Sequence, residues 1–519
     1  MPRSTLTDYW ARTQDPLRHM AGGLVLAIGV VGLAVVGLLV VMMPVIVSDG
    51  LVLISVSVLL AFLVYRSCPG GPLWAKAVAV IFLLNVVLNY GFANVVVGPG
   101  TTVMPVNELV LAVVVPIVFI RFGARIVTDG PSLLMLVAAA LPLVIHLPQD
   151  FPAFGLDAAR DALRNVDMFA YFAGIGLALT AESAETWRLW RNRLLRWTLV
   201  AASVYFLSYP ISTTLQRFSP YSFSYQQPIA LLGQFQSVQV FLVPLILGAF
   251  LIPGLFDNRS NTRRWLRWLV PSVGFAELVM FQHRTTYFVL LGSVGLLFLM
   301  GRRRVATALL AAACATGVGL AGLAASGFDF EGRIGRISLS TVEDQIEGIG
   351  DESSEHVQGR GFTQRADWWR SALTLWAENP KTMIFGVGYG IPLTNFHAAG
   401  TLGDVVVREP HNSFITSLVR GGLAGFLPWF LFHVWLLCQL LTAAFQRETE
   451  PHLERGFAQW LLVLFGSALF TAMFEPVYEL PFFAITLYIL WGSTIAELRL
   501  MPKGRFANAG GAIVLGHTP

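Results

Sequence analysis

Long apolar runs constrain the fold of this chain more than any other feature of its sequence. A helix that spans the hydrocarbon core of a bilayer needs about 20 mostly apolar residues. Only 13% of the residues are charged, against about 25% in a typical soluble domain. The sequence therefore predicts an all-α, polytopic transmembrane helical bundle of about 12–14 spans. The candidate spans are 21–47, 51–65, 73–97, 105–121, 132–148, 167–181, 194–210, 229–253, 265–281, 285–300, 305–325, 413–445, 457–474 and 480–499.

The basic residues between these runs fall mainly in alternate connections, as the positive-inside rule requires of cytoplasmic loops. Both termini are then cytoplasmic, and the first apolar run is an anchor because no small-residue cleavage site follows it. Scattered positive charge of this kind reflects topology and does not indicate nucleic-acid binding. The basic clusters are Arg66 with Lys76, Arg121 with Arg125, Arg188 to Arg196, Arg259 to Arg267, Arg302 to Arg304, and Arg447 with Arg455.

The spacing of the apolar runs divides the chain into three parts. Residues 1–325 form an N-terminal transmembrane bundle of about 11 spans. Residues 326–412 form one long external loop, and residues 413–519 form the C-terminal transmembrane helices and a cytoplasmic tail. The loop is the only sizeable hydrophilic segment, so we expect it to carry short helices of its own.

Three segments outside the membrane have distinct patterns. Acidic residues gather between Glu343 and Glu355, which favours a solvated stretch over the alternative of a divalent-cation site. The spacing of Trp369, Leu373 and Trp376 predicts a helix with one apolar stripe, lying at the membrane surface. A second, smaller surface helix is expected within 148–167.

Three polar residues stand nearly alone in or beside apolar sequence on the external side, namely Arg217, Arg284 and His411. A guanidinium group matches phosphate oxygens in a bidentate way. Asn412 is a good N-cap for the helix that follows, and an imidazole at a helix N-terminus tends to stay neutral, as a general base must. Structural interpretations remain open: a capping or packing role for His411, and snorkelling to lipid head groups for Arg284.

Glu277 and the cysteines complete the set of chemically notable residues. Glu277 lies two turns inside the bilayer from Arg284, and an intramembrane carboxylate needs a partner, so a structural pairing of the two is as plausible as a catalytic one. The three cysteines have no metal-like spacing, so neither a zinc site nor a disulfide framework is expected. We expect no metal and no cofactor.

Several motifs resemble those of the O-antigen ligase and O-antigen polymerase superfamily over roughly residues 205–445. The glycine triplet Gly386, Gly388 and Gly390 is by itself more often a tight turn than a phosphate cradle. The chain departs from the family in length, with two extra candidate spans and the acidic insertion before Arg360. The matching pieces are Arg284, Arg365 with Trp369, Gly386-Val-Gly-Tyr-Gly390, His411-Asn412, and the glycines at 421, 422 and 425.

The resemblance implies a metal-independent, inverting transfer of a glycan from an undecaprenyl-diphosphate-linked donor, at the periplasmic face of a bacterial inner membrane. The acceptor is a hydroxyl of a glycan or of lipid A-core, and membrane lipids surround the protein. His411 and Arg284 are the implied catalytic residues, with Arg217, Arg284 and Arg365 binding the diphosphate. The implied supporting residues are Asn412, Arg408, Arg420, Glu277, Gly386, Gly388 and Gly390.

Two alternatives stay open at this point. Ligation of a finished polymer onto lipid A-core and polymerisation of repeat units, including those of an exopolysaccharide, fit the sequence equally well. The main competitor from another class is a transporter or flippase of lipid-linked glycans, which would need ionisable groups at mid-bilayer on several helices. No Walker-type nucleotide-binding loop is present.

Overall fold

The structure is a computed structural model of the chain, and it describes the residues given at the end of this paragraph. The candidate spans 21–47 and 51–65 and the acidic segment 343–355 lie outside them. The described residues are 67–97, 104–218, 221–224, 227–230, 232–236, 238–256, 261–281, 283–326, 360–394, 397–398, 405–406, 408–445 and 453–501.

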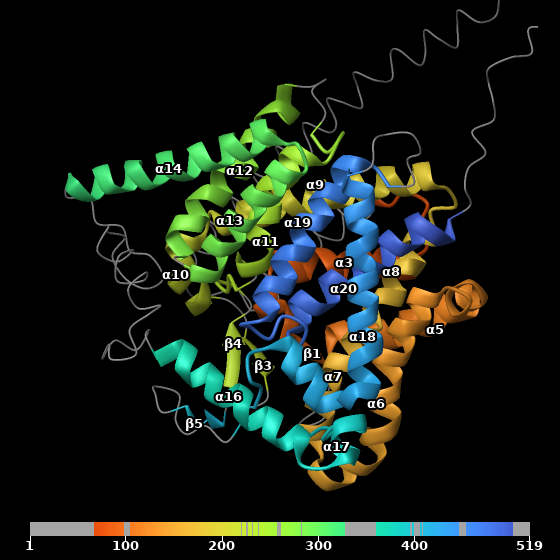
Figure 1. The fold of residues 1–519 in the computed structure, drawn as a ribbon. Coiled ribbons are helices and arrows are strands. Elements are labelled where there is room, and N and C mark those ends of the chain that lie inside the picture. The colour runs from red at the N-terminus through yellow and green to blue at the C-terminus, as the bar shows by residue number, and fades with distance from the viewer. Residues whose placement is uncertain are drawn as a thin grey trace, which may run out of the picture.

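Helices account for nearly all of the described structure (Figure 1). Each candidate span that falls within the described residues coincides with a helix or a pair of helices. These helices are α3 (Leu73–Val87), α4 (Asn89–Ala93), α5 (Val106–Val127), α6 (Gly130–Phe154), α8 (Ala170–Leu179), α9 (Ala184–Phe206), α11 (Val238–Leu251), α12 (Asn261–Phe281), α13 (Arg284–Leu299), α14 (Arg303–Ala325), α18 (Ser413–Phe445), α19 (Arg455–Ala472) and α20 (Pro481–Ile495).

The remaining elements are short and lie between these helices. Three two-stranded antiparallel ribbons pair β1 (Val96–Val97) with β2 (Met104–Pro105), β3 (Tyr221–Ser224) with β4 (Gln227–Ala230), and β5 (His397–Ala398) with β6 (Val405–Val406). The short helices are α7 (Leu156–Asp167), η1 (Tyr209–Ile211), α10 (Ser212–Phe218), α16 (Arg360–Ala377), α17 (Pro380–Phe385) and η2 (Ala496–Leu500). The helices expected around Trp369 and within 148–167 are therefore confirmed as α16 and α7, and their location at the membrane surface stays a prediction.

Among the described residues, five helices are long and apolar enough to cross a membrane, namely α5, α6, α18, α19 and α20 with its extension to Leu500. A sixth span is possible if α9 and the segment Tyr209–Gln216, which bend by 48° at their junction, cross together. The chain is thus an all-α polytopic membrane protein, as its sequence predicts. The number of 12–14 spans stays a prediction.

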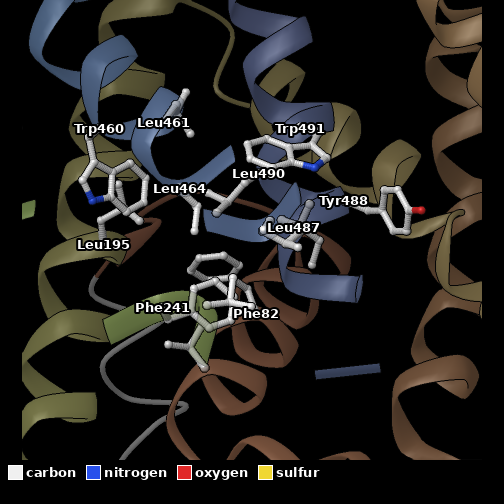
Figure 2. Packing of buried hydrophobic residues seen from close by; sticks show 14 of the residues in the cluster. Phe82, Leu195, Phe241, Trp460, Leu461, Leu464, Leu487, Tyr488, Leu490 and Trp491 are labelled. Atoms are coloured by element: carbon white, nitrogen blue, oxygen red, sulfur yellow. The ribbon is translucent and has the colours of Figure 1, made fainter. Parts of the chain in front are cut away.

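Helix α20 is the centre of the hydrophobic core. It is apolar on every side, and each residue from Phe482 to Ile495 is buried, as is every residue of α8. Figure 2 shows Leu487, Leu490 and Trp491 of α20 packed near aromatic and aliphatic side chains of α3, α11 and α19. A helix that is apolar all round lies in a protein core or in lipid, and the burial of α20 places it in the core.

Two glycines allow α8 and α20 to approach closely. A Cβ atom at Gly492 would collide with the backbone of Tyr171, and one at Gly174 would collide with the backbone of Ile489. Small residues at such crossings are the usual means by which helices pack tightly in membranes.

Other helices present apolar side chains outward. Ile120 of α5 is 85% exposed, and Val144 of α6 is 70% exposed. Leu431 and Val434 of α18 are exposed as well. Large exposed apolar surfaces of this kind are rare in soluble monomers, but they suit contact with lipid.

Helix α18 is broken near its start, which the continuous apolar run 413–445 did not predict. Gly422 has φ 60° and ψ −170°, so the helix is interrupted there. At the break, the carbonyls of Val419 and Arg420 accept hydrogen bonds from Val387 N (2.9 Å) and Gly388 N (3.2 Å). The loop that follows α17 is thereby fixed to α18, and Figure 1 shows α16 and α17 at one end of the bundle beside the start of α18.

We predict that Gly492→Ala destabilises the protein by at least ~1–3 kcal/mol, because the added methyl group meets the α8 backbone rather than a movable side chain. The matched control is Gly466→Ala on α19, where a Cβ atom meets nothing within 4 Å. The control should leave stability unchanged or raise it slightly. Thermal unfolding of both purified variants in detergent is the measurement, and equal melting temperatures would contradict the close approach of α8 and α20.

Candidate functional site

His411 lies at the start of α18 in an unusual backbone conformation. Its φ is 51°, in the left-handed region that costs a non-glycine residue about 1–3 kcal/mol. Its side chain is 36% exposed. The adjacent Asn412 is the helix N-cap, as expected, since its Oδ1 accepts hydrogen bonds from Phe414 N (3.0 Å) and Ile415 N (3.1 Å). Backbone strain of this kind persists only where surrounding contacts hold it, and it is common at functional sites.

Glu475 connects His411 to Arg365. Its Oε2 lies 3.4 Å from His411 Nδ1, and its Oε1 accepts a hydrogen bond from Arg365 Nη2 at 2.9 Å. The ring of Trp368 packs against the same imidazole at a tilt of 43°, with 5.2 Å between ring centroids. Burial raises the pKa of the Glu475 carboxyl, but the hydrogen bond from His411 and the charge of Arg365 outweigh burial and leave the pKa below its ordinary value. Glu475 is therefore held as a carboxylate between two nitrogen donors.

The turn formed by residues 473–480, between α19 and α20, is fixed to the start of α18. Asn412 Nδ2 donates to the Met473 carbonyl (3.0 Å), and Tyr478 N donates to Ser413 Oγ (3.1 Å). Ser413 Oγ in turn donates to Glu479 Oε2 at 2.5 Å. Burial raises the pKa of Glu479 to about 7, although Arg164 opposes the shift. Because the turn is bonded at three points, Glu475 is presented to His411 by a rigid support.

The start of α13 lies close to this cluster. His283, the residue before Arg284, acts electrostatically on Glu475 and helps to lower the pKa of that carboxyl. Arg284 is the first residue of α13, and its side chain lies outside the described part of the structure. Because Arg284 directly follows His283, its backbone also lies near Glu475, the residue that contacts His411 and Arg365.

Arg217 and Glu277 are less closely connected to the cluster. Arg217 lies in α10, directly after η1, where the ring of Tyr209 is 4.6 Å from that of Phe281 at the end of α12. The side chain of Arg217 is also outside the described part. Glu277 is buried, and its Oε2 has no hydrogen-bond partner among the described residues. The convergence of the two guanidinium groups on His411, and the pairing of Glu277 with Arg284, stay predictions.

Arg408 and Arg420 belong to a second cluster, centred on Asp161 of α7. Arg408 Nη2 lies 2.8 Å from Asp161 Oδ2, and Arg420 Nη2 lies 3.0 Å from the same atom. Arg420 is fully buried and also binds Glu409 at 2.9 Å. Burial raises the pKa of Asp161, and the charge of Arg420 opposes that shift without reversing it. These two arginines are occupied by protein carboxylates and hold the segment before His411 in place.

The glycine triplet packs the loop against its neighbours. Gly386, Gly388 and Gly390 have φ values of 91°, 80° and 90°. A Cβ atom at any of the three would collide with a neighbouring residue. The four consecutive N–H groups from residue 387 to residue 390 donate to protein acceptors: the Val419 and Arg420 carbonyls, the Asp150 side chain and the Asp161 side chain. The triplet is therefore a tightly packed turn, and its N–H groups are not free to cradle a phosphate.

Sequence reasoning missed Asp161 and Glu475. Asp161 lies on the expected surface helix, but α7 buries one face, including Ala158, Ala162 and Arg164. Its signal was the spacing of opposite charges along that helix, at Asp157, Arg160, Asp161 and Arg164. Glu475 lies in a short turn between two apolar runs, where it and Glu479 are the acidic residues, a detectable but weak signal.

The described residues hold no group of three or more His, Cys, Asp or Glu side chains that could bind a metal ion.

Comparison with known proteins agrees with this arrangement. Residues 272–430 match the model of the family described as O-antigen ligase, just under a third of the chain. The matched segment includes Arg284, Arg365, the glycine triplet and His411. The resemblance to the O-antigen ligase and polymerase superfamily is thus confirmed over these residues, and it supports a role in membrane glycan ligation or polymerisation. No curated protein matches the chain.

We predict that Asp161→Asn destabilises the protein by about 3 kcal/mol or more, because it leaves the buried charge of Arg420 with a single carboxylate partner. The control is Asp157→Asn on the same helix, whose carboxylate is half exposed and also pairs with Arg160 and Arg408. The control should cost less than ~1 kcal/mol. Unfolding of both variants in detergent measures the difference, and a tolerated Asp161→Asn would argue against the clamp.

Proposed function

We propose that the protein transfers a glycan from an undecaprenyl-diphosphate-linked donor to an acceptor hydroxyl, with inversion and without a metal. The reaction takes place at the periplasmic face of a bacterial inner membrane, with both termini cytoplasmic. The observation that carries the proposal is His411: a partly exposed imidazole in a strained backbone, next to a carboxylate, an arginine and the start of α13. The match of residues 272–430 to the O-antigen ligase family supports the same reaction class.

Each reacting atom has a group suited to it. His411 takes the proton of the acceptor hydroxyl as its oxygen bonds to the anomeric carbon of the donor sugar. The bond from that carbon to the diphosphate oxygen breaks at the same time, and undecaprenyl diphosphate leaves with the bonding electrons. The face opposite the leaving group is attacked, so the configuration at the anomeric carbon inverts.

The arginines supply the charge that this departure requires. Arg284 and Arg217 are proposed to bind the diphosphate, because preorganised guanidinium groups stabilise a developing anion without a metal. Arg365 is the third arginine proposed to bind the diphosphate. Its Nη2 is engaged with Glu475, but a guanidinium has five N–H donors and the side chain is 30% exposed, so donors remain for phosphate. Arg408 and Arg420 act at a distance, by fixing the loop that leads to His411.

The acceptor distinguishes two versions of this activity. A glycan acceptor would make the protein an O-antigen or exopolysaccharide polymerase, and a lipid A-core acceptor would make it a ligase. Purified protein incubated with a lipid-linked oligosaccharide separates them. A ladder of products indicates polymerisation, and a single jump onto added lipid A-core indicates ligation. Relocation of unreacted donor across a vesicle membrane would indicate transport and would overturn the proposal.

We predict that His411→Ala and Arg284→Ala each abolish polymer transfer while the protein still reaches the membrane. Loss of a positioned base removes a factor of about 10²–10⁴, and loss of a charge-stabilising donor removes a factor of about 10²–10³. Glycan profiles of a deletion strain carrying each variant are the measurement.

The matched control is Arg370→Ala, on the same helix as Arg365 but with its side chain 77% exposed and paired only with Asp367 in the described structure. This variant should transfer glycan at the wild-type level. Normal profiles from both His411→Ala and Arg284→Ala would refute the proposed roles.

A further inference from the structure

Glu475 is the one carboxylate in hydrogen-bond contact with His411 among the described residues. Its two oxygens have separate partners: Oε1 binds Arg365 and Oε2 faces His411 Nδ1. Its side chain is only 17% exposed. The turn that carries it is bonded to Asn412 and Ser413, the two residues that follow His411. The carboxylate and the imidazole are thus held by the same few residues at the start of α18.

We infer that Glu475 is the positioning residue of His411: it fixes the imidazole with the proton on Nδ1 and leaves Nε2 as the nitrogen that takes the acceptor proton. An ionised carboxylate can only accept hydrogen bonds, so the nitrogen that faces it carries the hydrogen. The other ring nitrogen of a neutral imidazole is then unprotonated and basic. A buried carboxylate that orients a catalytic histidine in this way also stabilises the imidazolium that forms.

The charges around the pair agree with this assignment. Arg365 of α16 and His283 at the start of α13 both act on Glu475 and favour its ionised form. Glu479 of the same turn contacts Ser413 and Arg164, and the described structure gives it no contact with His411. The ring of Trp368 contacts the imidazole at a tilt of 43° and carries no charge. Glu475 is therefore the anionic group that the imidazolium would face.

The inference rests on the proposed function for its effect on catalysis, but its effect on proton binding does not. Diethyl pyrocarbonate modifies neutral imidazole, so the rate of His411 modification against pH reports when this side chain loses its proton. The peptide that contains His411 can be followed by mass spectrometry of the purified full-length protein, because the side chain is partly exposed.

We predict that Glu475→Gln moves the midpoint of His411 modification to lower pH, because the imidazolium loses its anionic neighbour. Glu479→Gln is the matched control on the same turn and should leave the midpoint within ~0.3 units of wild type. An unchanged midpoint in Glu475→Gln would overturn the inference. If Glu475→Gln does not fold, Glu475→Asp tests the same point, with a smaller downward shift expected.

Transfer activity provides a second readout. Glu475→Gln should lower kcat by between ~10-fold and ~10⁴-fold with a smaller change in the KM for donor, and should shift the acid limb of the pH profile to lower pH. Glu475→Asp should restore part of kcat. If Glu475→Gln acted only by disturbing Arg365, it would resemble Arg365→Ala. We expect that variant to have a raised KM for donor and an unmoved acid limb of the pH profile. A shifted modification midpoint in a protein without transfer activity would refute the proposed function and leave the role of Glu475 intact.

Discussion

The buried contact of Arg420 with Asp161 and Glu409 is the interaction on which this end of the molecule depends. Removing a guanidinium from water costs several kcal/mol, which only close carboxylates and further acceptors can offset. Arg420 finds those acceptors on α7, on the segment before His411 and in the carbonyls of Gly388 and Ile391. One side chain therefore joins α7 to three nearby stretches of chain: the loop after α17, the segment before His411, and α18 itself.

The break in α18 also fixes the loop after α17 to this end of the helix. Carbonyls of a continuous helix would be used within the helix, so the loop after α17 could not bond to them. The turn at Gly422 exposes the carbonyls of Val419 and Arg420, and the loop N–H groups use both. Any side chain at Gly386 or Gly422 would push the backbone of the loop away from the backbone of α18. The start of α18 is thus a short, rigid platform, and the apolar remainder of the helix is free to face lipid.

The parts of this structure that the sequence predicts are those set by local rules. Hydropathy located the helices, Asn412 identified the start of α18, and the Trp369 stripe located α16, because each signal lies within a few residues. The residues that complete the site are set by pairings across long separations: Glu475 meets a histidine 64 positions away, and Asp161 meets an arginine 247 positions away. No periodicity encodes such pairs. The break at Gly422 escaped notice for a related reason, since glycines 421, 422 and 425 are equally compatible with a continuous helix in a membrane.

The left-handed backbone of His411 has a consequence for engineering this protein. Glycine adopts that φ at a lower backbone cost, so a choice of stabilising substitutions made from backbone geometry alone would replace this histidine. The imidazole lost in that exchange is the one that contacts Glu475 and Trp368. On the proposed function, position 411 is therefore one where a gain in stability would be paid in activity.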